Sequence, residues 1–255
     1  MTTAAPEAPL LPGRRVLVTG ARRGLGAAMV ETFAAMGAGG VAVDLPGTPW
    51  TLPAGWTGVD ADVTDEAQVA GAVAHAAGHP DGIDGVVAAA GVVPTWQEPG
   101  DLDLDDLDRV LSVNVRGVAA VLKHAGAVLR PGSSVVVVGS LNSWRGDPRI
   151  WSYVASKHAA LGLARSAAAA LGPDGVRVNC VAPGPVATDA LLDRMRSRVG
   201  STGLSPEQAL AAAADQTALR RTATTADVVN ATAFLLSDLA AGITGQLLPV
   251  DGGLL

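Results

Sequence analysis

Short β-branched, apolar runs alternate along this chain with longer amphipathic segments rich in alanine and leucine. This alternation is typical of βαβ units and a parallel sheet. The predicted strands are Arg15–Thr19, Val41–Asp44, Gly58–Asp60, Ile83–Ala89, Val135–Gly139, Arg177–Ala182 and Gln246–Val250. The predicted helices between them lie at about 24–37, 65–77, 103–129, 152–172 and 225–237.

The pattern shows no internal repeat, linker or break in composition, so we predict one domain over residues 13–255. Its expected fold class is α/β: a Rossmann fold whose doubly wound, seven-stranded parallel sheet has helices on both faces. Residues 1–12 are predicted to be a disordered tail. Residues 189–215 have a helical pattern that two glycines and a proline interrupt, and we predict that they form a substrate lid.

Composition and charge narrow the class of protein. The chain is 49% hydrophobic but only 3% aromatic, so its core must be built from alanine, valine and leucine. A net charge of −6 disfavours nucleic-acid and anionic-membrane partners. The single cysteine, Cys180, excludes an internal disulfide. Without a signal-peptide pattern or an apolar run of about 20 residues, we expect a soluble, cytoplasmic protein.

The first predicted strand runs through a glycine-rich turn, Leu17–Gly26, into the first helix. Its glycines allow the backbone to turn tightly and approach a pyrophosphate, which the N–H groups at the helix N-terminus can bind. Any tight βα connection favours glycine, so the turn alone is weak evidence. Asp44 strengthens it, because it ends the second strand about twenty residues further on. The segment therefore predicts a dinucleotide site.

Asp44 and two arginines of the turn favour different dinucleotides. An acidic residue in that position accepts hydrogen bonds from the adenosine ribose and repels a 2′-phosphate, which favours NAD. Arg22 and Arg23 could instead bind the additional phosphate of NADP. We give Asp44 more weight, because a carboxylate facing a phosphate is a direct penalty whereas an exposed arginine can swing away. Asp62 and Val63 are candidates for contact with the adenine, although they equally fit a helix N-cap region.

The only tyrosine of the chain, Tyr153, precedes Lys157 by four residues on a predicted helix. Residues at i and i+4 share a face, so the lysine can place its charge beside the phenol. A fixed cation favours the phenolate and suits the tyrosine to acid/base catalysis. An amphipathic helix with a core aromatic and a solvated lysine has the same spacing, so the pair alone leaves both interpretations open.

Taken in order, these motifs resemble those of the short-chain dehydrogenase/reductase family, over roughly Arg14 to Gly253. The family's Thr-Gly-x-x-x-Gly-x-Gly turn is present as Thr19–Gly26, and its Tyr-x-x-x-Lys pair is the one just described. Its active-site serine, thirteen residues before the tyrosine, matches Ser140, and its helical asparagine matches Asn114. The resemblance implies the catalytic set Asn114, Ser140, Tyr153 and Lys157.

Two later segments also match, and one position departs from the family. Asn179–Thr188 is similar to the segment that lies along the nicotinamide, and Val250–Gly253 to the closing strand and turn. Where the family commonly has Asn-Asn-Ala-Gly, this chain has Ala88-Ala89-Ala90-Gly91. The lost amides would have tied neighbouring strands together, so we expect less rigidity near the adenosine, without inactivation.

The resemblance implies an oxidoreductase that acts on a secondary alcohol or ketone, and Asp44 favours NAD over NADP as its cofactor. Tyr153 would exchange a proton with the substrate oxygen while hydride passes between the nicotinamide and the adjacent carbon. Ser140 would donate a hydrogen bond to that oxygen, Lys157 would assist the phenol and hold the nicotinamide ribose, and Asn114 would position a water. The expected cofactor-binding residues are Gly20, Arg22, Arg23, Gly24, Leu25, Gly26, Asp44, Asp62, Val63, Ala90, Gly91, Tyr153, Lys157, Pro183, Gly184, Val186 and Thr188.

Three of the five tryptophans lie in segments that border the catalytic site in the family. They predict a pocket for a bulky apolar or cyclic alcohol or ketone, with packing under a loop or at a subunit contact as an equal alternative for each. The expected substrate-binding residues are Leu141, Trp144, Trp151, Trp96 and Pro185.

The sequence also allows other functions. An NADPH-dependent carbonyl reductase would require an arginine of the turn to outweigh Asp44, and a catalytically silent nucleotide-binding regulator would have kept only the fold. The four histidines lack ligand spacing, and the acidic run Asp101–Asp108 is expected to begin a helix, so no metal site is predicted. We expect a homotetramer or homodimer, as the family usually forms.

Overall fold

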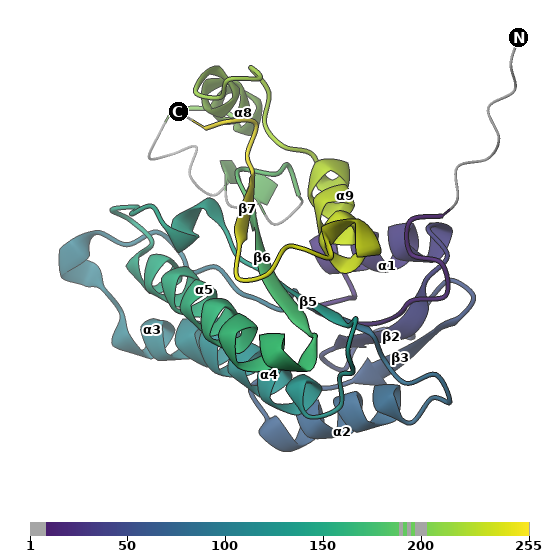
Figure 1. The fold of residues 1–255 in the computed structure, drawn as a ribbon. Helices are drawn as coiled ribbons and strands as arrows, with labels where there is room; N and C mark the ends of the chain where they lie inside the picture. The colour runs from purple at the N-terminus through teal and green to yellow at the C-terminus, as the bar shows by residue number, and fades with distance from the viewer. Residues whose placement is uncertain (1–8, 189–190, 193–194, 197–202, 255) are drawn as a thin grey trace, which may run out of the picture.

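A seven-stranded sheet forms the centre of the protein, and all its neighbouring strands are parallel (Figure 1). This computed structural model describes residues 9–188, 191–192, 195–196 and 203–254. The strand order is β3-β2-β1-β4-β5-β6-β7, and the fold class is therefore the predicted one. The strands are β1 (Arg15–Thr19), β2 (Gly39–Asp44), β3 (Trp56–Asp60), β4 (Gly85–Ala88), β5 (Ser134–Val138), β6 (Arg177–Pro183) and β7 (Leu247–Val250).

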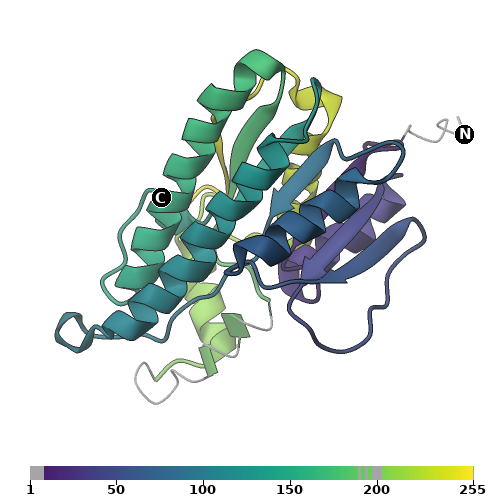
Figure 2. The ribbon, with the colours of Figure 1, turned by 90° about the horizontal axis from the view of Figure 1, so that it is seen from below.

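Helices cover both faces of this sheet. Two of them pack together on one face, α1 (Gly24–Ala35) and α9 (Thr225–Leu236). The other face carries α2 (Glu66–Ala77), α4 (Val118–Gly126) and α5 (Trp151–Leu171), which lie side by side in Figure 2, with α3 (Leu104–Leu111) packed against α5. A further helix, α8 (Pro206–Asp215), belongs to the lobe beyond the carboxyl ends of the strands, at the top of Figure 1.

The core consists of two aliphatic layers, one on each side of the sheet. Strand β5 contributes to both layers. Val135 and Val137 belong to the layer under α2, α4 and α5, whereas Val136 and Val138 belong to the layer under α1 and α9. Alternate side chains of a strand point to opposite faces, so a strand covered on both sides must be apolar throughout.

Two predicted boundaries differ from the structure. The expected tail of residues 1–12 is too long, because Leu11 is fully buried in the layer under α1 and donates its backbone N–H to the Met36 carbonyl oxygen at 3.0 Å. The helix expected at 103–129 is divided into α3, a turn of π-helix named η2 (Ser112–Gly117), and α4. Inside η2, Asn114 makes tertiary contacts with Val92 and Ser156.

Part of the predicted lid lies outside the described residues, namely 189–190, 193–194 and 197–202. Its described end forms α8, which begins with a capping box: the Ser205 hydroxyl accepts the Gln208 backbone N–H, and the Gln208 side chain accepts the Ser205 N–H. Among the described helices, none has the length and apolar character needed to span a lipid bilayer.

Candidate active site

Most of the predicted site residues lie at or just after the carboxyl ends of β1 to β6, which meet at one edge of the parallel sheet (Figure 1). In open α/β sheets, ligands bind outside this edge where the strand order reverses. Here the order reverses between β1 and β4. The glycine-rich turn follows β1, Ser140 follows β5, and the other catalytic candidates lie on η2 and α5.

The glycine-rich turn is shaped to bring backbone close to an anion. Gly20 and Gly24 have φ angles of 70° and 58°, in the left-handed region that favours glycine. A Cβ atom at Gly26 would lie 2.0 Å from the Gly20 carbonyl oxygen, so only glycine fits there. Arg23 caps α1 with extended backbone, and no side chain accepts a hydrogen bond from the first turn. The N-terminal N–H groups of α1 can therefore bind a pyrophosphate.

Asp44 ends β2 with its carboxylate held in place by backbone donors. One oxygen accepts the Arg22 N–H and the other accepts the Leu45 N–H, both at 2.8 Å. Each carboxylate oxygen has a second acceptor position, so Asp44 can still accept hydrogen bonds from a ribose. Arg23, which immediately follows Arg22, has an exposed side chain.

The hydroxyl of Thr19 ties β1 to the segment that follows β4. Its Oγ1 accepts the backbone N–H groups of Ala89 and Ala90, at 3.1 and 3.2 Å. Gly20 touches the same segment, since a Cβ there would lie 2.8 Å from the Ala90 Cα. These contacts join the two strands although Ala88 and Ala89 replace the amides common in the family.

Tyr153 and Lys157 lie one turn apart near the start of α5, as the spacing predicts. The Lys157 ammonium is 5.5 Å from the centre of the Tyr153 ring and donates one hydrogen bond to the Val138 carbonyl oxygen at 2.8 Å. The lysine residue is only 6% exposed. An ammonium has three donors, so two remain for the phenol and for a ribose hydroxyl.

Asn114 lies in the π-helical turn η2, is 1% exposed and uses its side chain as a brace. Its Oδ1 accepts the Val92 N–H at 2.8 Å, and its Nδ2 donates to the Val92 carbonyl at 2.8 Å and to the Ser156 hydroxyl at 3.0 Å. Ser156 in turn donates to the Tyr153 carbonyl oxygen at 2.8 Å. The brace thus joins three segments: η2, the chain after β4, and α5.

Gly91 separates Asn114 from Lys157 at the centre of the site. A Cβ atom at this position would lie 3.3 Å from the Asn114 Oδ1 and 3.8 Å from the Lys157 Nζ. Neither Ser156 nor the π-helical form of η2 was predicted from the sequence. Only the position of Ser156 directly before Lys157 could have drawn attention to it.

Ser140 follows β5 and caps the short 3₁₀ turn η3 (Leu141–Ser143). Its Oγ accepts the Asn142 N–H at 3.2 Å, and its own N–H donates to the Ser143 Oγ at 3.1 Å. The turn η3 packs against α5, which carries Tyr153. A Cβ atom at Gly139 would lie 2.6 Å from the Cys180 Sγ, so the chain can enter this turn only through a glycine.

The segment after β6 is held by the C-terminal turn. Pro183 ends β6, and Gly184 donates its N–H to the Val250 carbonyl oxygen at 3.0 Å. A Cβ atom at Gly184 would lie 2.7 Å from the Asp251 Cβ. Val186 is buried, and its carbonyl oxygen accepts the Thr188 N–H at 2.7 Å. The backbone of this predicted nicotinamide segment is therefore fixed up to Thr188.

Asp62 and Val63 lie between β3 and α2. The Asp62 carboxylate accepts both the N–H and the hydroxyl of Thr64, at 2.8 Å. Val63 is buried and packs against η2, where a Cβ at Gly117 would be 2.9 Å from its side chain. Asp65 is the N-cap of α2, and hydrogen bonds from Gln68 lower the pKa of its carboxyl group. Asp62 thus shapes the turn and leaves the capping of α2 to Asp65.

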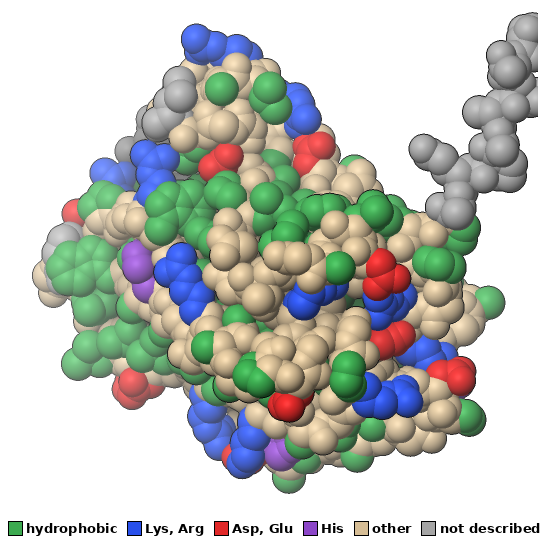
Figure 3. Space-filling view, in the orientation of Figure 1, with side chains coloured by type: hydrophobic (Ala, Val, Ile, Leu, Met, Phe, Trp, Pro, Cys, Tyr) green, Lys and Arg blue, Asp and Glu red, His purple; other side chains and the backbone are tan. Residues whose placement is uncertain are grey.

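Three of the predicted substrate residues differ in exposure. Trp144 and Trp151 are 39% and 47% exposed. Trp96 is less exposed and lies under the Arg149 guanidinium, whose Cζ is 5.1 Å from the centre of the indole ring. Leu141, in η3, and Pro185, after β6, are half-buried. In Figure 3 a band of apolar side chains runs beneath the lobe that carries α8, above the carboxyl edge of the sheet.

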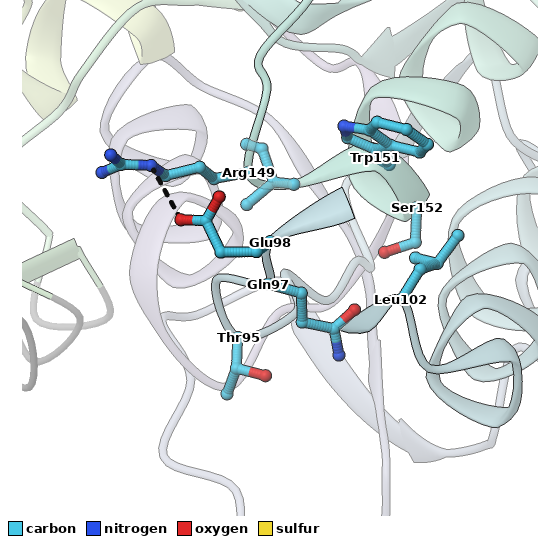
Figure 4. A pocket seen from close by; sticks show the side chains of 8 residues that line it. Thr95, Gln97, Glu98, Leu102, Arg149, Trp151 and Ser152 are labelled. Atoms are coloured by element: carbon cyan, nitrogen blue, oxygen red, sulfur yellow. Dashed lines mark ion pairs between the residues drawn. The ribbon is translucent and has the colours of Figure 1, made fainter. Parts of the chain in front are cut away.

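Arg149 joins the two loops that carry these tryptophans. Its side chain pairs with Glu98 at 3.7 Å, and its carbonyl oxygen accepts the Gln97 N–H at 3.0 Å (Figure 4). Of the predicted substrate residues only Trp151 lines the groove beside this junction, and none of the four catalytic candidates does. The groove is lined by Thr95, Gln97, Glu98, Leu102, Arg149, Ile150, Trp151 and Ser152.

Comparison with known proteins shows the family of this chain. A family model described as enoyl-(acyl carrier protein) reductase matches residues 20–255. The chain is 38% identical over 258 residues to short-chain dehydrogenase reductase 5 of Arabidopsis thaliana, covering 95% of each protein. The chain belongs to the short-chain dehydrogenase/reductase family. Its fold is also that of levodione reductase, with a TM-score of 0.87, 30% identity, and coverage of 95% of this chain and 97% of the other.

Other members of the short-chain dehydrogenase/reductase family carry activities in their names. The chain is 36% identical over 256 residues to the mitochondrial (−)-isopiperitenol/(−)-carveol dehydrogenase of Mentha piperita, covering 96% of this chain and 94% of that protein. The chain spans 44% of the length of one further curated relative, so that likeness concerns one part of a longer protein.

The residues present fit the nicotinamide dinucleotide that the family uses. A pyrophosphate fits the close backbone approach at Gly26 and the uncapped start of α1. A ribose fits the fixed carboxylate of Asp44. In the described part of the chain, no three side chains of His, Cys, Asp or Glu converge to hold a metal ion.

Proposed function

We propose that this member of the short-chain dehydrogenase/reductase family is an NAD(H)-dependent oxidoreductase that interconverts a secondary alcohol and a ketone. The observation that carries the proposal is that Gly91 lies against Asn114 and Lys157, one helical turn from Tyr153, and that η3, which Ser140 caps, packs against the same helix. Bound NAD(H) would supply the hydride acceptor or donor. Gly20, Gly24, Gly26 and Asp44 would hold its pyrophosphate and adenosine ribose.

The protein's own groups would handle the proton. Tyr153 would exchange it with the substrate oxygen, and Ser140, whose Oγ accepts the Asn142 N–H, would donate its hydroxyl proton in a hydrogen bond to that oxygen. Lys157 has two donors left after its bond to Val138, which suit the phenol and the nicotinamide ribose. The Asn114 amide is engaged by Val92 and Ser156, so its side chain would act by fixing η2 against α5 and holding any relay water in place.

A bulky apolar or cyclic substrate is the best match to the rim of the site. Trp144 follows the turn η3 and Trp151 begins α5, two residues before Tyr153, and both side chains are exposed. Leu141 and Pro185 add apolar surface. Two similar proteins have names that refer to cyclic substrates, (−)-isopiperitenol/(−)-carveol dehydrogenase and levodione reductase.

For the assembly and the compartment, we propose a homotetramer or homodimer in the cytoplasm. The outward face of α5 presents small side chains, including Ala155, Gly162, Ser166 and Ala169, which allow close helix–helix packing. The single cysteine fits a reducing compartment. Light scattering after size exclusion measures the mass; a monomer would contradict the assembly.

The test is a panel of alcohols and ketones with both NAD(H) and NADP(H), read at the nicotinamide absorbance. We expect turnover of cyclic secondary alcohols with NAD, and a loss of about 10²–10⁴-fold in kcat for Tyr153→Phe with NAD affinity nearly unchanged. Lys157→Met should weaken NAD binding as well. A Tyr153→Phe variant with near-normal turnover would refute the mechanism, and absence of turnover in the wild type would favour a silent regulator.

An NADPH-dependent carbonyl reductase is the second candidate. The observation in its favour is the exposed Arg23 at the N-cap of α1, close to where the 2′-phosphate would approach Asp44. The same panel decides between the two, because this candidate requires a higher kcat/KM with NADPH than with NADH.

A further inference from the structure

A cluster of charges at the adenosine end of the site joins Asp44 and Arg22 to Asp60, a residue that the family motif does not assign. Asp44 and Asp60 are register partners on the neighbouring parallel strands β2 and β3, so both carboxylates leave the sheet at the same edge. Arg22 contacts both: its backbone N–H binds Asp44 at 2.8 Å, and its guanidinium forms an ion pair with Asp60. The cation is therefore paired with Asp60, whereas Asp44 receives only a neutral backbone N–H from Arg22.

The guanidinium of Arg22 is held on several sides. Its Nε donates to the Leu45 carbonyl oxygen at 2.9 Å, and one terminal nitrogen donates to the Thr48 carbonyl oxygen. Its plane lies over the Trp50 ring, 3.8 Å from the ring centre. The side chain is only 16% exposed. Arg22 thus fastens the loop after β2, and its charge is directed away from the turn that would meet the cofactor.

Trp50 and Asp60 support each other in holding Arg22. The Trp50 indole N–H donates to the Asp60 carboxylate at 3.0 Å. The ring lies flat on Gly58 of β3, where a Cβ atom would come within 2.3 Å of it. The absence of a side chain at Gly58 therefore makes the space in which Trp50 stacks on Arg22.

We propose that Asp60 is a specificity-determining residue of the cofactor site, because it holds Arg22 against Trp50 and leaves Asp44 as an uncompensated anion that excludes the 2′-phosphate of NADP. This inference rests on the NAD preference proposed above. The charges of Asp44, Asp60 and Arg22 sum to −1 in the wild type. Removal of the Asp60 charge brings the sum to zero and frees Arg22 to neutralise Asp44 or to bind the phosphate.

Coulomb's law gives the size of the effect. One elementary charge about 6 Å from a phosphate dianion changes its binding about tenfold even with the dielectric constant of water. NAD lacks this phosphate, so its affinity should change much less. The ratio of the dissociation constants of NADP⁺ and NAD⁺ therefore isolates the interaction.

The experiment measures this ratio by calorimetry for four proteins at low ionic strength. Asp60→Asn keeps the shape of the side chain and should lower the ratio about tenfold. Arg22→Gln brings the sum of charges to −2 and should raise the ratio by a similar factor. The double variant Asp60→Asn/Arg22→Gln restores a sum of −1 and should return close to the wild type. Each shift should shrink at high salt.

A matched control removes the same charge elsewhere. Asp81→Asn lies before β4, at the opposite edge of the sheet, and should leave the ratio unchanged. An unchanged ratio in folded Asp60→Asn, or a double variant that stays at the value of Asp60→Asn, would overturn the inference. If Asp60→Asn does not fold, a ratio that fails to rise in Arg22→Gln overturns it. A wild type that binds NADP⁺ more tightly than NAD⁺ would instead refute the proposed cofactor preference.

Discussion

Substitution of Asn114 by alanine tests whether its side chain is a structural brace. The change deletes three hydrogen bonds, two to the Val92 backbone and one to the Ser156 hydroxyl, at a site that is 1% exposed. At about 1 kcal/mol net for each bond, the free energy of unfolding should fall by about 3 kcal/mol. For a chain of this size, that corresponds to a fall of roughly 6–12 °C in Tm.

Urea unfolding followed by circular dichroism measures this loss, and an unchanged m-value shows that the extent of unfolding is the same. Ser156→Ala is the matched variant. It removes one of the three bonds together with the bond from Ser156 to the Tyr153 carbonyl, so its loss should be about 1–2 kcal/mol. If Asn114→Ala unfolds within about 0.5 kcal/mol of the wild type, the brace contributes nothing and the reasoning is wrong.

Three other outcomes are expected. Asp227→Asn removes the partner of Arg221, which holds the pKa of the Asp227 carboxyl well below its usual value. A lowered pKa stabilises the fold above about pH 4, so the free energy of unfolding of the variant should be about 1 kcal/mol lower at neutral pH. The difference from the wild type should shrink progressively below about pH 4, and equal differences in urea titrations at neutral pH and at low pH would contradict this. Burial raises the pKa of the Cys180 thiol to about 11, so alkylation in the folded protein at about pH 8 should be at least about tenfold slower than in urea, and equal rates would refute its burial. Trp144→Ala should raise the activation free energy for cyclic ketones by ~1–3 kcal/mol, and so lower kcat/KM, with little change in stability. Lost stability with unchanged selectivity would show that Trp144 serves packing.

The sheet could be predicted from the sequence because each strand carries its own local signal. Val135–Val138 is apolar at four successive positions, and a strand covered on both faces has no other pattern. The predicted strands and the helix that carries Tyr153 agree with the structure to within one or two residues. Leu11 could not be predicted, because nothing near it in the sequence shows that the end of α1 would cover it.

The missed features depend on partners far along the chain. Residues 112–117 are compatible with an ordinary α-helix, and the contacts that accompany the π-helical turn join Asn114 to residues 22 and 42 positions away. Likewise, Arg22 in the glycine-rich turn was a candidate for binding a phosphate, and its actual partner, Asp60, is 38 positions further on. The family resemblance pointed to Asn114 and the glycine-rich turn pointed to Arg22, whereas the contacts of both residues depend on the tertiary fold.

The two ends of the site should therefore respond differently to mutation. Asn114, Ser156 and Lys157 are polar groups buried in an aliphatic core, so a substitution there leaves unpaired groups and lowers stability together with turnover. Asp60 is 47% exposed in its side chain and Arg23 is also exposed, so their replacement leaves few buried groups without partners. Changes of cofactor preference at the adenosine end should then be tolerated by the fold, whereas changes at the catalytic end should require compensating substitutions elsewhere.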